Sequence, residues 1–127
     1  MSYAPTEWES YHKGWQQRRA QILAVLESRR AETLETAKRC AHILVEEYGA
    51  RAVYGFGSLY EGRLHERSDL DLAVEGLSPA RYFKAYARVC AECPDDIRVD
   101  LVPMESVSDT FRERIRTRGR RVDATTG

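Results

Sequence analysis

The chain has 127 residues, 43% of them hydrophobic, so it can bury one core and we expect a single domain over residues 1–127. Twenty basic and twenty acidic residues balance to zero net charge, so a nucleic-acid partner is not expected. No apolar run is long enough for a signal peptide or a membrane span, and three cysteines are too few for a disulfide scaffold. We therefore expect a cytoplasmic protein with no membrane partner.

The N-terminal part, residues 1–49, is predicted to be a helical extension made of two helices. The first covers about residues 7–28, where Thr6 and Glu9 have capping-box spacing and apolar side chains recur at helical intervals: Trp8, Tyr11, Trp15, Ile22 and Leu26. The second, near 31–48, ends before Gly49. We expect the aromatic stripe of the first helix to pack on the second helix and the sheet. Docking of a partner, or of a second copy in a homo-oligomer, is the alternative.

Strands and helices alternate in the remainder, residues 50–120. Three short apolar, β-prone runs predict strands at about 51–56, 69–75 and 97–102. Helices are predicted directly after Ser58, from Ser78-Pro79 with Tyr82, Phe83, Tyr86 and Val89 on one face, and over about 105–118 before Gly119. This order predicts an α/β fold with a small, mixed, three-stranded sheet flanked by helices.

A small-residue turn and two carboxylates form the most informative pattern in the chain. Gly57-Ser58 follows the first apolar strand, and Asp69-Leu70-Asp71 begins after ten intervening residues. Alternate side chains of a strand share a face, so Asp69 and Asp71 point together. A third carboxylate, Asp100, lies in the next β-like run.

These residue types suit a metal-bound nucleoside triphosphate. Backbone N–H groups at a glycine turn attract phosphate oxygens, and Ser58 adds a hydroxyl. Two acids on one face repel each other, and a divalent cation with oxygen ligands, Mg²⁺ or Mn²⁺, removes that cost. Two such ions can activate an attacking oxygen and stabilise a leaving pyrophosphate.

Other phosphate and metal motifs do not fit this stretch. A Walker A loop needs Gly-Lys-Ser/Thr, a dinucleotide fingerprint needs glycine where Tyr60 stands, and an EF-hand needs an oxygen ligand where Ala73 stands. The alternative that remains is a solvated turn beside an edge strand with exposed acids. Cys90 and Cys93 form a Cys-x-x-Cys pair without a second ligand pair, so we interpret them as ordinary, partly buried thiols.

The combination of Gly57-Ser58, Asp69-x-Asp71 and Asp100 resembles the nucleotidyltransferase superfamily related to DNA polymerase β. The small size and the phrase Ser-Asp-Leu-Asp-Leu look most like the minimal nucleotidyltransferases often encoded beside a HEPN-domain protein. This chain departs from many minimal relatives in having Glu61 where they carry arginine, with Arg63 and Arg67 nearby.

The resemblance implies transfer of AMP from ATP to an acceptor hydroxyl, with Mg²⁺ or Mn²⁺ as cofactor. Asp69 and Asp71 would bind both metal ions, Asp100 would hold the catalytic ion and help to deprotonate the acceptor, and Gly57 and Ser58 would position the β- and γ-phosphates. The implied acceptor is a HEPN-type ribonuclease toxin, which would make this chain an antitoxin. A non-catalytic antitoxin that only binds its partner, and a transferase acting on a small molecule or an RNA end, remain open.

Overall fold

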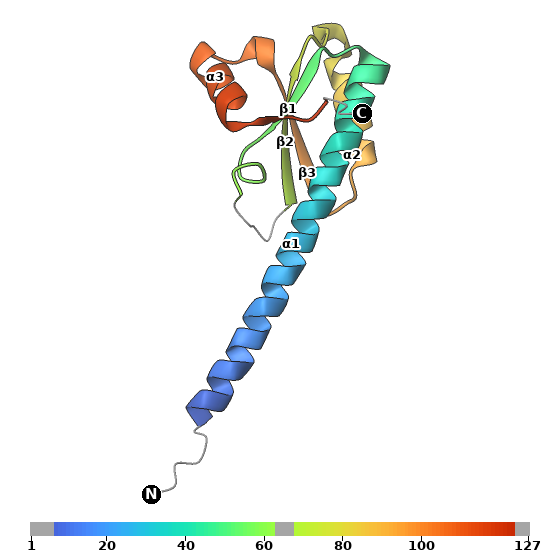
Figure 1. Ribbon diagram of the computed structural model, residues 1–127. Helices are drawn as coiled ribbons and strands as arrows, with labels where there is room; N and C mark the ends of the chain where they lie inside the picture. Colours follow the sequence, from blue (N-terminus) through green and yellow to red (C-terminus); the bar gives the residue numbers. More distant parts are fainter. Residues whose placement is uncertain (1–6, 63–67, 124–127) are drawn as a thin grey trace, which may run out of the picture.

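The computed structural model describes residues 7–62 and 68–123 and confirms the α/β fold (Figure 1). Two short 3₁₀ turns, Pro79–Arg81 and Met104–Ser106, lead into the second and third helices. The main elements in chain order are α1 Glu7–Tyr48, β1 Ala52–Phe56, β2 Ser68–Glu75, α2 Tyr82–Glu92, β3 Ile97–Pro103, α3 Asp109–Arg118 and β4 Arg120–Arg121.

The sheet is mixed and has four strands in the order β3-β2-β1-β4. β1 is antiparallel to β2 and to β4, whereas β2 and β3 are parallel. The sequence predicted three strands, because a two-residue strand such as β4 is too short to show a period-2 pattern. In the parallel pair Asp71 lies opposite Asp100, so both of these acids belong to the same face of neighbouring strands.

The two predicted N-terminal helices are in fact one continuous helix, α1. No glycine or proline occurs between Trp15 and Tyr48, so nothing in the backbone breaks the helix near residue 30. Two buried threonines are accommodated because Thr33 and Thr36 donate their hydroxyls to the carbonyls of Arg29 and Glu32, at 2.8 and 3.0 Å. Despite its length, no part of α1 or of the other described helices is apolar enough to cross a membrane.

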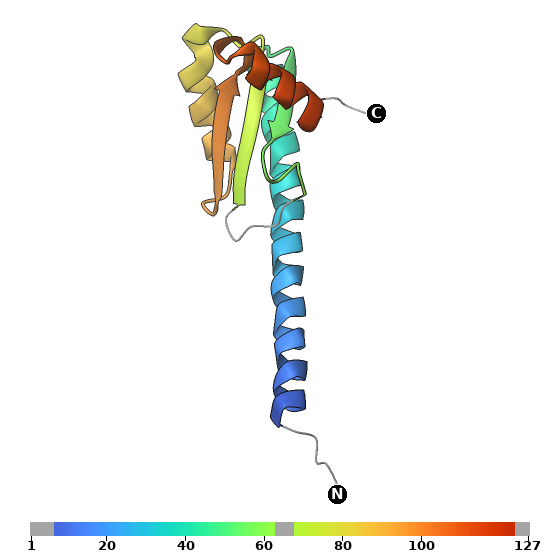
Figure 2. The same cartoon turned by 90° about the vertical axis from the view of Figure 1, so that its left-hand side faces the viewer.

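Only the C-terminal half of α1 packs on the sheet. Its buried side chains form one core with the inner face of β1, β2 and β3 and with Ala85 and Val89 of α2; those from α1 are Ala37, Cys40, Ala41 and Leu44. The N-terminal half projects away from the sheet (Figures 1 and 2). Trp8, Tyr11 and Trp15 are 66%, 60% and 46% exposed, so the expectation that this stripe packs on the sheet is wrong.

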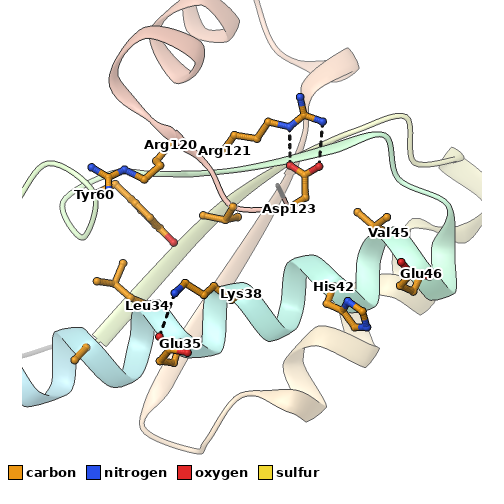
Figure 3. Close-up of a pocket in the computed structure, with 12 residues that line it drawn as sticks. Leu34, Glu35, Lys38, His42, Val45, Glu46, Tyr60, Arg120, Arg121 and Asp123 are labelled. Atoms are coloured by element: carbon orange, nitrogen blue, oxygen red, sulfur yellow. Dashed lines mark hydrogen bonds and ion pairs between the residues drawn. The ribbon is translucent and has the colours of Figure 1, made fainter. Parts of the chain in front are cut away.

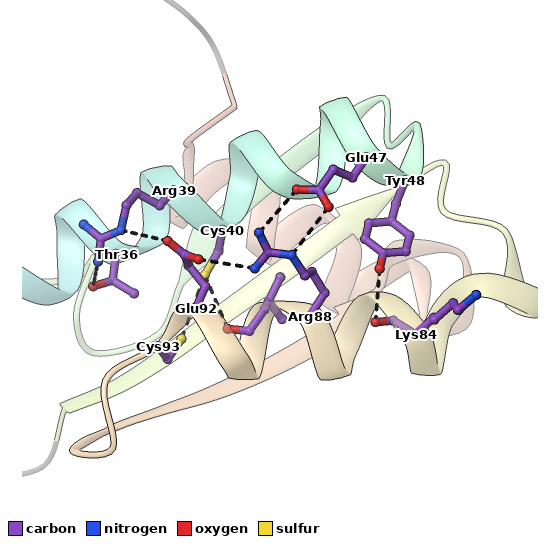
Figure 4. Close-up of polar contacts among 10 residues, drawn as sticks. Thr36, Arg39, Cys40, Glu47, Tyr48, Lys84, Arg88, Glu92 and Cys93 are labelled. Atoms are coloured by element: carbon purple, nitrogen blue, oxygen red, sulfur yellow. Dashed lines mark hydrogen bonds and ion pairs between the residues drawn. The ribbon is translucent and has the colours of Figure 1, made fainter.

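Polar contacts join α1 to α2 along their exposed edge (Figure 4). Arg88 of α2 reaches Glu47 of α1 at 3.4 Å, and Arg39 of α1 reaches Glu92 of α2 at 3.4 Å. Cys93 lies next to Cys40 rather than to Cys90, with 3.9 Å between the sulfur atoms, and all three cysteines are free thiols. The two sulfur atoms that the fold brings together are therefore not those of the Cys-x-x-Cys pair.

α3 covers the opposite face of the sheet and encloses a smaller core of Ala73, Met104 and Ile115 (Figure 2). It begins at Asp109 rather than at residue 105, because Ser108 caps the helix by accepting the N–H of Phe111 at 3.2 Å. α3 contacts β1 and β4 and lies over one end of the sheet (Figure 2). The face of the sheet that carries Asp69, Asp71 and Asp100 continues beyond it.

The aromatic face expected on α2 is only partly buried. Tyr82 and Tyr86 donate to carbonyls of β3, but Phe83 is 81% exposed.

We expect Leu72→Ala, at a fully buried site in β2, to lower the free energy of unfolding by about 3 kcal/mol. The matched control Phe83→Ala should change it by less than about 0.5 kcal/mol. Urea unfolding followed by circular dichroism measures both, and equal losses would contradict this view of the core.

Candidate active site

Gly57 and Ser58 lie in a tight turn at the end of β1, not at the start of a helix as predicted. The carbonyl of Gly57 accepts the N–H groups of Tyr60 and Glu61, both at 3.1 Å, and the chain turns again at Gly62. Gly57 has φ +80°, a conformation that side chains with a Cβ rarely adopt. The segment therefore closes as a turn, with Ser58 partly exposed within it.

Two contacts hold this turn in place. The ring of Tyr60 covers Gly55 of β1 so closely that a Cβ there would lie 2.1 Å from the ring, which only glycine allows. Arg30 of α1 donates its Nε to the carbonyl of Leu59 at 3.3 Å. Arg30 and Gly55 are thus supporting residues that the motif alone did not indicate. Gly55 could have been suspected, since a glycine inside a strand often marks a close approach.

Asp71 is the acid next to the turn. It lies opposite Phe56 in the antiparallel pair of β1 and β2, and a Cβ added to Gly57 would lie 2.4 Å from its Oδ2. The glycine is therefore needed both for its backbone angle and for the space that the carboxylate occupies. The predicted partners Gly57 and Asp71, fourteen residues apart in the sequence, are in direct contact range in the fold.

Asp69 and Asp100 complete a group of acids on this face. Asp100 is the register partner of Asp71 on β3, and neighbouring strands lie about 4.8 Å apart. Asp69 precedes Asp71 by two residues on β2, so it points the same way. Both Asp69 and Asp100 are exposed, whereas Asp71 is half-buried.

Electrostatic interaction links the three carboxylates. Burial raises the pKa of Asp71 above its ordinary value, and the charges of Asp100 and Asp69 raise it further. Within residues 7–62 and 68–123, no three acidic, histidine or cysteine side chains converge tightly enough to form a ready-made metal site. The donor set itself, three oxygen-bearing acids on adjacent strands, is the kind that Mg²⁺ or Mn²⁺ prefers.

Two further residues belong to this face but were missed by the motif. Arg98 is the register partner of Asp69 and precedes Asp100 by two residues, so strand alternation places it on the side of the acids. Phe56 lies beside Asp71 and packs edge-to-face on Phe111 of α3, with ring centroids 5.8 Å apart. The alternation of side chains along a strand, counted back from Asp100, could have placed Arg98 on this face. No local signal could have paired Phe56 with Phe111.

Basic residues occur both near the turn and at the C-terminus, and the structure describes only some of them. Arg63, His65 and Arg67 lie outside the described residues. Of the C-terminal arginines, Arg112 bonds to Asp109 and to the carbonyls of Met104 and Val107, and Arg121 pairs with Asp123 at 2.9 Å. These two side chains serve the fold of the C-terminal segment.

A hollow of about 800 Å³ lies between α1 and the β4 edge of the sheet (Figure 3). Its walls include Leu34, Lys38 and His42 of α1 together with Tyr60 and Arg120. None of Gly57, Ser58, Asp69, Asp71 or Asp100 lines it. The acids instead occupy the other, open face of the sheet, so this hollow is separate from the candidate active site.

Comparison with known families decides how this arrangement is classified. The family described as polymerase beta, nucleotidyltransferase matches residues 38–124, which includes the turn, all four strands and the three acids. The chain is a member of the polymerase β nucleotidyltransferase family. Most of the projecting half of α1 lies outside the matched region, so the family relationship concerns the sheet and the elements packed on it.

Individual relatives agree with this membership. The chain is 34% identical over 89 residues to the "probable protein adenylyltransferase MntA" of Haemophilus influenzae, covering 68% of this nucleotidyltransferase and 75% of the relative. A solved minimal nucleotidyltransferase is 27% identical, with a TM-score of 0.56 over 69% of this chain and 91% of the other. A toxin–antitoxin crystal structure with AMP-PNP has the same TM-score at 24% identity, covering 70% of this chain and 74% of that one, and it shows a shared fold.

Proposed function

We propose that this nucleotidyltransferase is a protein adenylyltransferase and antitoxin: it transfers AMP from ATP to a hydroxyl side chain of a HEPN-type toxin. The observation that carries the proposal is the packing of Gly57 against Asp71, on an open sheet face shared with Asp69 and Asp100. The name of the MntA relative, a protein adenylyltransferase, supports protein as the acceptor. The toxin–antitoxin complex with AMP-PNP supports ATP as the donor.

In the proposed reaction the acceptor oxygen attacks the α-phosphorus of ATP. A new P–O bond forms, the bond to the bridging oxygen breaks, and pyrophosphate leaves with the electron pair. The hydroxyl proton passes to a carboxylate oxygen of Asp100, which is solvent-exposed. Gly57 allows the triphosphate to approach the backbone of the turn, and Ser58 adds a hydrogen bond to a phosphate oxygen.

The donor set fits one or two divalent cations, which Asp69, Asp71 and Asp100 would hold. Bound Mg²⁺ or Mn²⁺ would neutralise the triphosphate and the departing pyrophosphate. The raised pKa of Asp71 is consistent with such a site, since a nearby cation relieves the repulsion among the three acids. Arg98, the register partner of Asp69, would add a permanent positive charge for the triphosphate. ATP and a protein toxin are both cytoplasmic substrates, and we place this enzyme in that compartment.

The decisive experiment compares this chain with its Asp100→Asn variant. Incubation with ATP, Mg²⁺ and the product of the neighbouring reading frame should add the mass of an adenylyl group to a hydroxyl side chain of that partner. Asp100→Asn should lower the rate by about 10²-fold or more, because it removes a metal ligand and the proton acceptor. Asp96→Asn, the same exchange in the exposed turn before β3, should leave the rate unchanged.

Two outcomes would favour the competing functions. If Asp100→Asn still neutralises the toxin as well as the original chain does, the antitoxin acts by contact alone. If the partner gains no mass while a small molecule or an RNA 3′ end does, the acceptor class is wrong. Intact-protein mass spectrometry after the two proteins are separated distinguishes covalent modification from binding.

A further inference from the structure

Two of the three cysteines face each other where α1 packs against α2. Cys40 lies on the buried side of α1, and Cys93 is the residue directly after the last turn of α2 (Figure 4). Their sulfur atoms are 3.9 Å apart although the two residues are 53 positions apart in the sequence, and both are free thiols. A disulfide bond is about 2 Å long, so the two sulfur atoms need to approach each other by only about 2 Å. The fold thus places two thiols where one covalent bond could join them.

The two thiols differ in their exposure. Cys40 is fully buried, and its Sγ lies 3.9 Å from the carbonyl oxygen of Val89 as well as 3.9 Å from the sulfur of Cys93. Cys93 is partly exposed, and its backbone is extended rather than helical. A small solute can therefore reach Cys93 from solvent, whereas Cys40 is shielded from it.

The hydrogen bond between the two sulfur atoms also makes Cys93 the more reactive thiol. It lowers the pKa of Cys93 below its ordinary value, and the positive charge of Arg39 acts in the same direction against the opposing effects of burial and Glu92. The same hydrogen bond, together with burial, raises the pKa of Cys40. The thiolate is the nucleophilic form of cysteine, so Cys93 is the thiol that reacts first, and Cys40 stays protonated beside it.

We propose that Cys93 is a redox modification site: a hydroperoxide oxidises it, and Cys40 converts the product into an intramolecular disulfide. A hydroperoxide such as H₂O₂ is small enough to reach a partly exposed sulfur, and the second thiol that the reaction needs already lies in contact with the first. Cys90, the neighbour of Cys93 in the Cys-x-x-Cys pair, is also partly exposed, but the sulfur that lies 3.9 Å from Cys93 is that of Cys40.

The reaction has two steps. In the first, the Cys93 sulfur attacks one peroxide oxygen: an S–O bond forms, the O–O bond breaks, and the leaving oxygen takes the electron pair and a proton as water. Cys93 is then a sulfenic acid. In the second, the Cys40 sulfur attacks the sulfur of Cys93: an S–S bond forms, the S–O bond breaks, and hydroxide leaves with the Cys40 proton as water. Two thiols are oxidised and H₂O₂ is reduced to two waters, and a dithiol reductant reverses the change by thiol–disulfide exchange.

The disulfide would join α1 to the segment that leads from α2 into β3, the strand of Asp100. It would close a loop from residue 40 to residue 93 that contains β1, the turn at Gly57 and β2. A bond that closes a loop of this length restricts the unfolded chain more than the folded one. The oxidised protein should therefore melt at a higher temperature than the reduced protein, by about 5 °C or more.

Peptide mapping of the full chain tests the proposal without any substitution. The reduced protein is treated with H₂O₂ in the presence of a metal chelator, and the remaining thiols are alkylated after denaturation. Two of the three thiols should be lost, and the one that is alkylated should be Cys90. Digestion with trypsin and Glu-C, which cuts after Glu92 between Cys90 and Cys93, should give one disulfide-linked pair of peptides that contains Cys40 and Cys93. Dithiothreitol should restore all three thiols.

Three single variants separate the roles of the cysteines. Cys93→Ser should slow the loss of thiols by about tenfold or more, because the exposed and reactive sulfur is removed. Cys40→Ala should stop at the sulfenic acid of Cys93, which dimedone traps, because the resolving thiol is absent. The matched control is Cys90→Ser, which removes the cysteine that takes no part in the reaction, and it should form the disulfide as fast as the original chain.

Four outcomes would overturn the proposal: no loss of thiols in excess H₂O₂, a disulfide between Cys90 and Cys93 or between two chains, equally fast oxidation of Cys93→Ser, or an oxidised chain that melts no higher than the reduced one. Cys40 is fully buried, so Cys40→Ala can lower stability, but the peptide map of the unsubstituted chain does not depend on this variant. None of these measurements involves ATP or a partner protein. The redox site and the proposed enzymatic function can therefore fail independently.

Discussion

Replacing Asp69 and Asp71 together by asparagine should reduce AMP transfer by ~10³-fold or more and leave the fold intact. Both side chains point from β2 to the open face, and asparagine matches the shape of aspartate while removing the negative charge that a cation needs. The measurement is transfer of labelled AMP from ATP to the partner protein. Asp95→Asn with Asp96→Asn, the same exchange in the exposed turn before β3, is the matched control.

Stability should move in the opposite direction from activity in this double variant. Asp71 has a pKa above its ordinary value, chiefly because of burial, so its ionisation in the folded protein costs stability. Protonated Asp71 therefore stabilises the fold at low pH, and this stabilisation is lost as the pH rises through the folded-state pKa of Asp71. Without metal, the variant should therefore melt at a higher temperature than the original chain at neutral pH, and the difference should shrink in acid.

The change in melting temperature on adding Mg²⁺ is a second, independent test of the two acids. It should raise the melting temperature of the original chain, because a ligand that binds only the folded state stabilises it, and should have little effect on the double variant. Undiminished AMP transfer by the double variant would remove Asp69 and Asp71 from the catalytic assignment. Equal stabilisation of both proteins by Mg²⁺ would place the cation elsewhere.

Gly57→Val should weaken ATP binding by about tenfold or more even when metal is present, because valine introduces two faults at once. Its Cβ would lie 2.4 Å from Oδ2 of Asp71, so the carboxylate must move, and φ +80° is unfavourable for a β-branched residue. Isothermal titration calorimetry with a non-hydrolysable ATP analogue measures the affinity directly.

Gly62→Val separates strain from collision. Gly62 lies in the same turn at φ +82°, but a Cβ there would meet no atom of the described residues within 4 Å. This control should lose about 1–2 kcal/mol of stability through backbone strain and keep most of its ATP affinity. Equal loss of affinity in the two variants would mean that the turn acts through its conformation, not through the space beside Asp71.

Much of the candidate site could be predicted from the sequence, since local chemistry determines it. The requirement for glycine before a serine, and the period of two that puts Asp69 and Asp71 on one face, are properties of short segments. The α/β class and the three main strands followed from the alternation of apolar runs and helical patterns. The family resemblance depended on the same residues and was confirmed by the match over residues 38–124.

Other features depend on residues that are distant in the sequence, and only the tertiary structure decided them. Asp100 faces Asp71, and Arg98 faces Asp69, because β2 and β3 are parallel and in one particular register. β4 forms because Arg120 and Arg121 pair with β1, and a segment of two residues carries no sequence pattern from which a strand can be predicted. Gly55 is required by the ring of Tyr60, and the turn at Ser58 is held by Arg30 of α1.

The aromatic stripe shows most clearly which features the sequence determines and which depend on the tertiary structure. Helical spacing was sufficient to predict that Trp8, Tyr11 and Trp15 share a face, because the period of a helix is a local property. Whether that face is buried depends on how far the sheet extends along α1, and the sheet covers only the C-terminal half of the helix (Figure 1). Periodicity therefore determined the stripe, and the length of the neighbouring strands decided that it remains exposed.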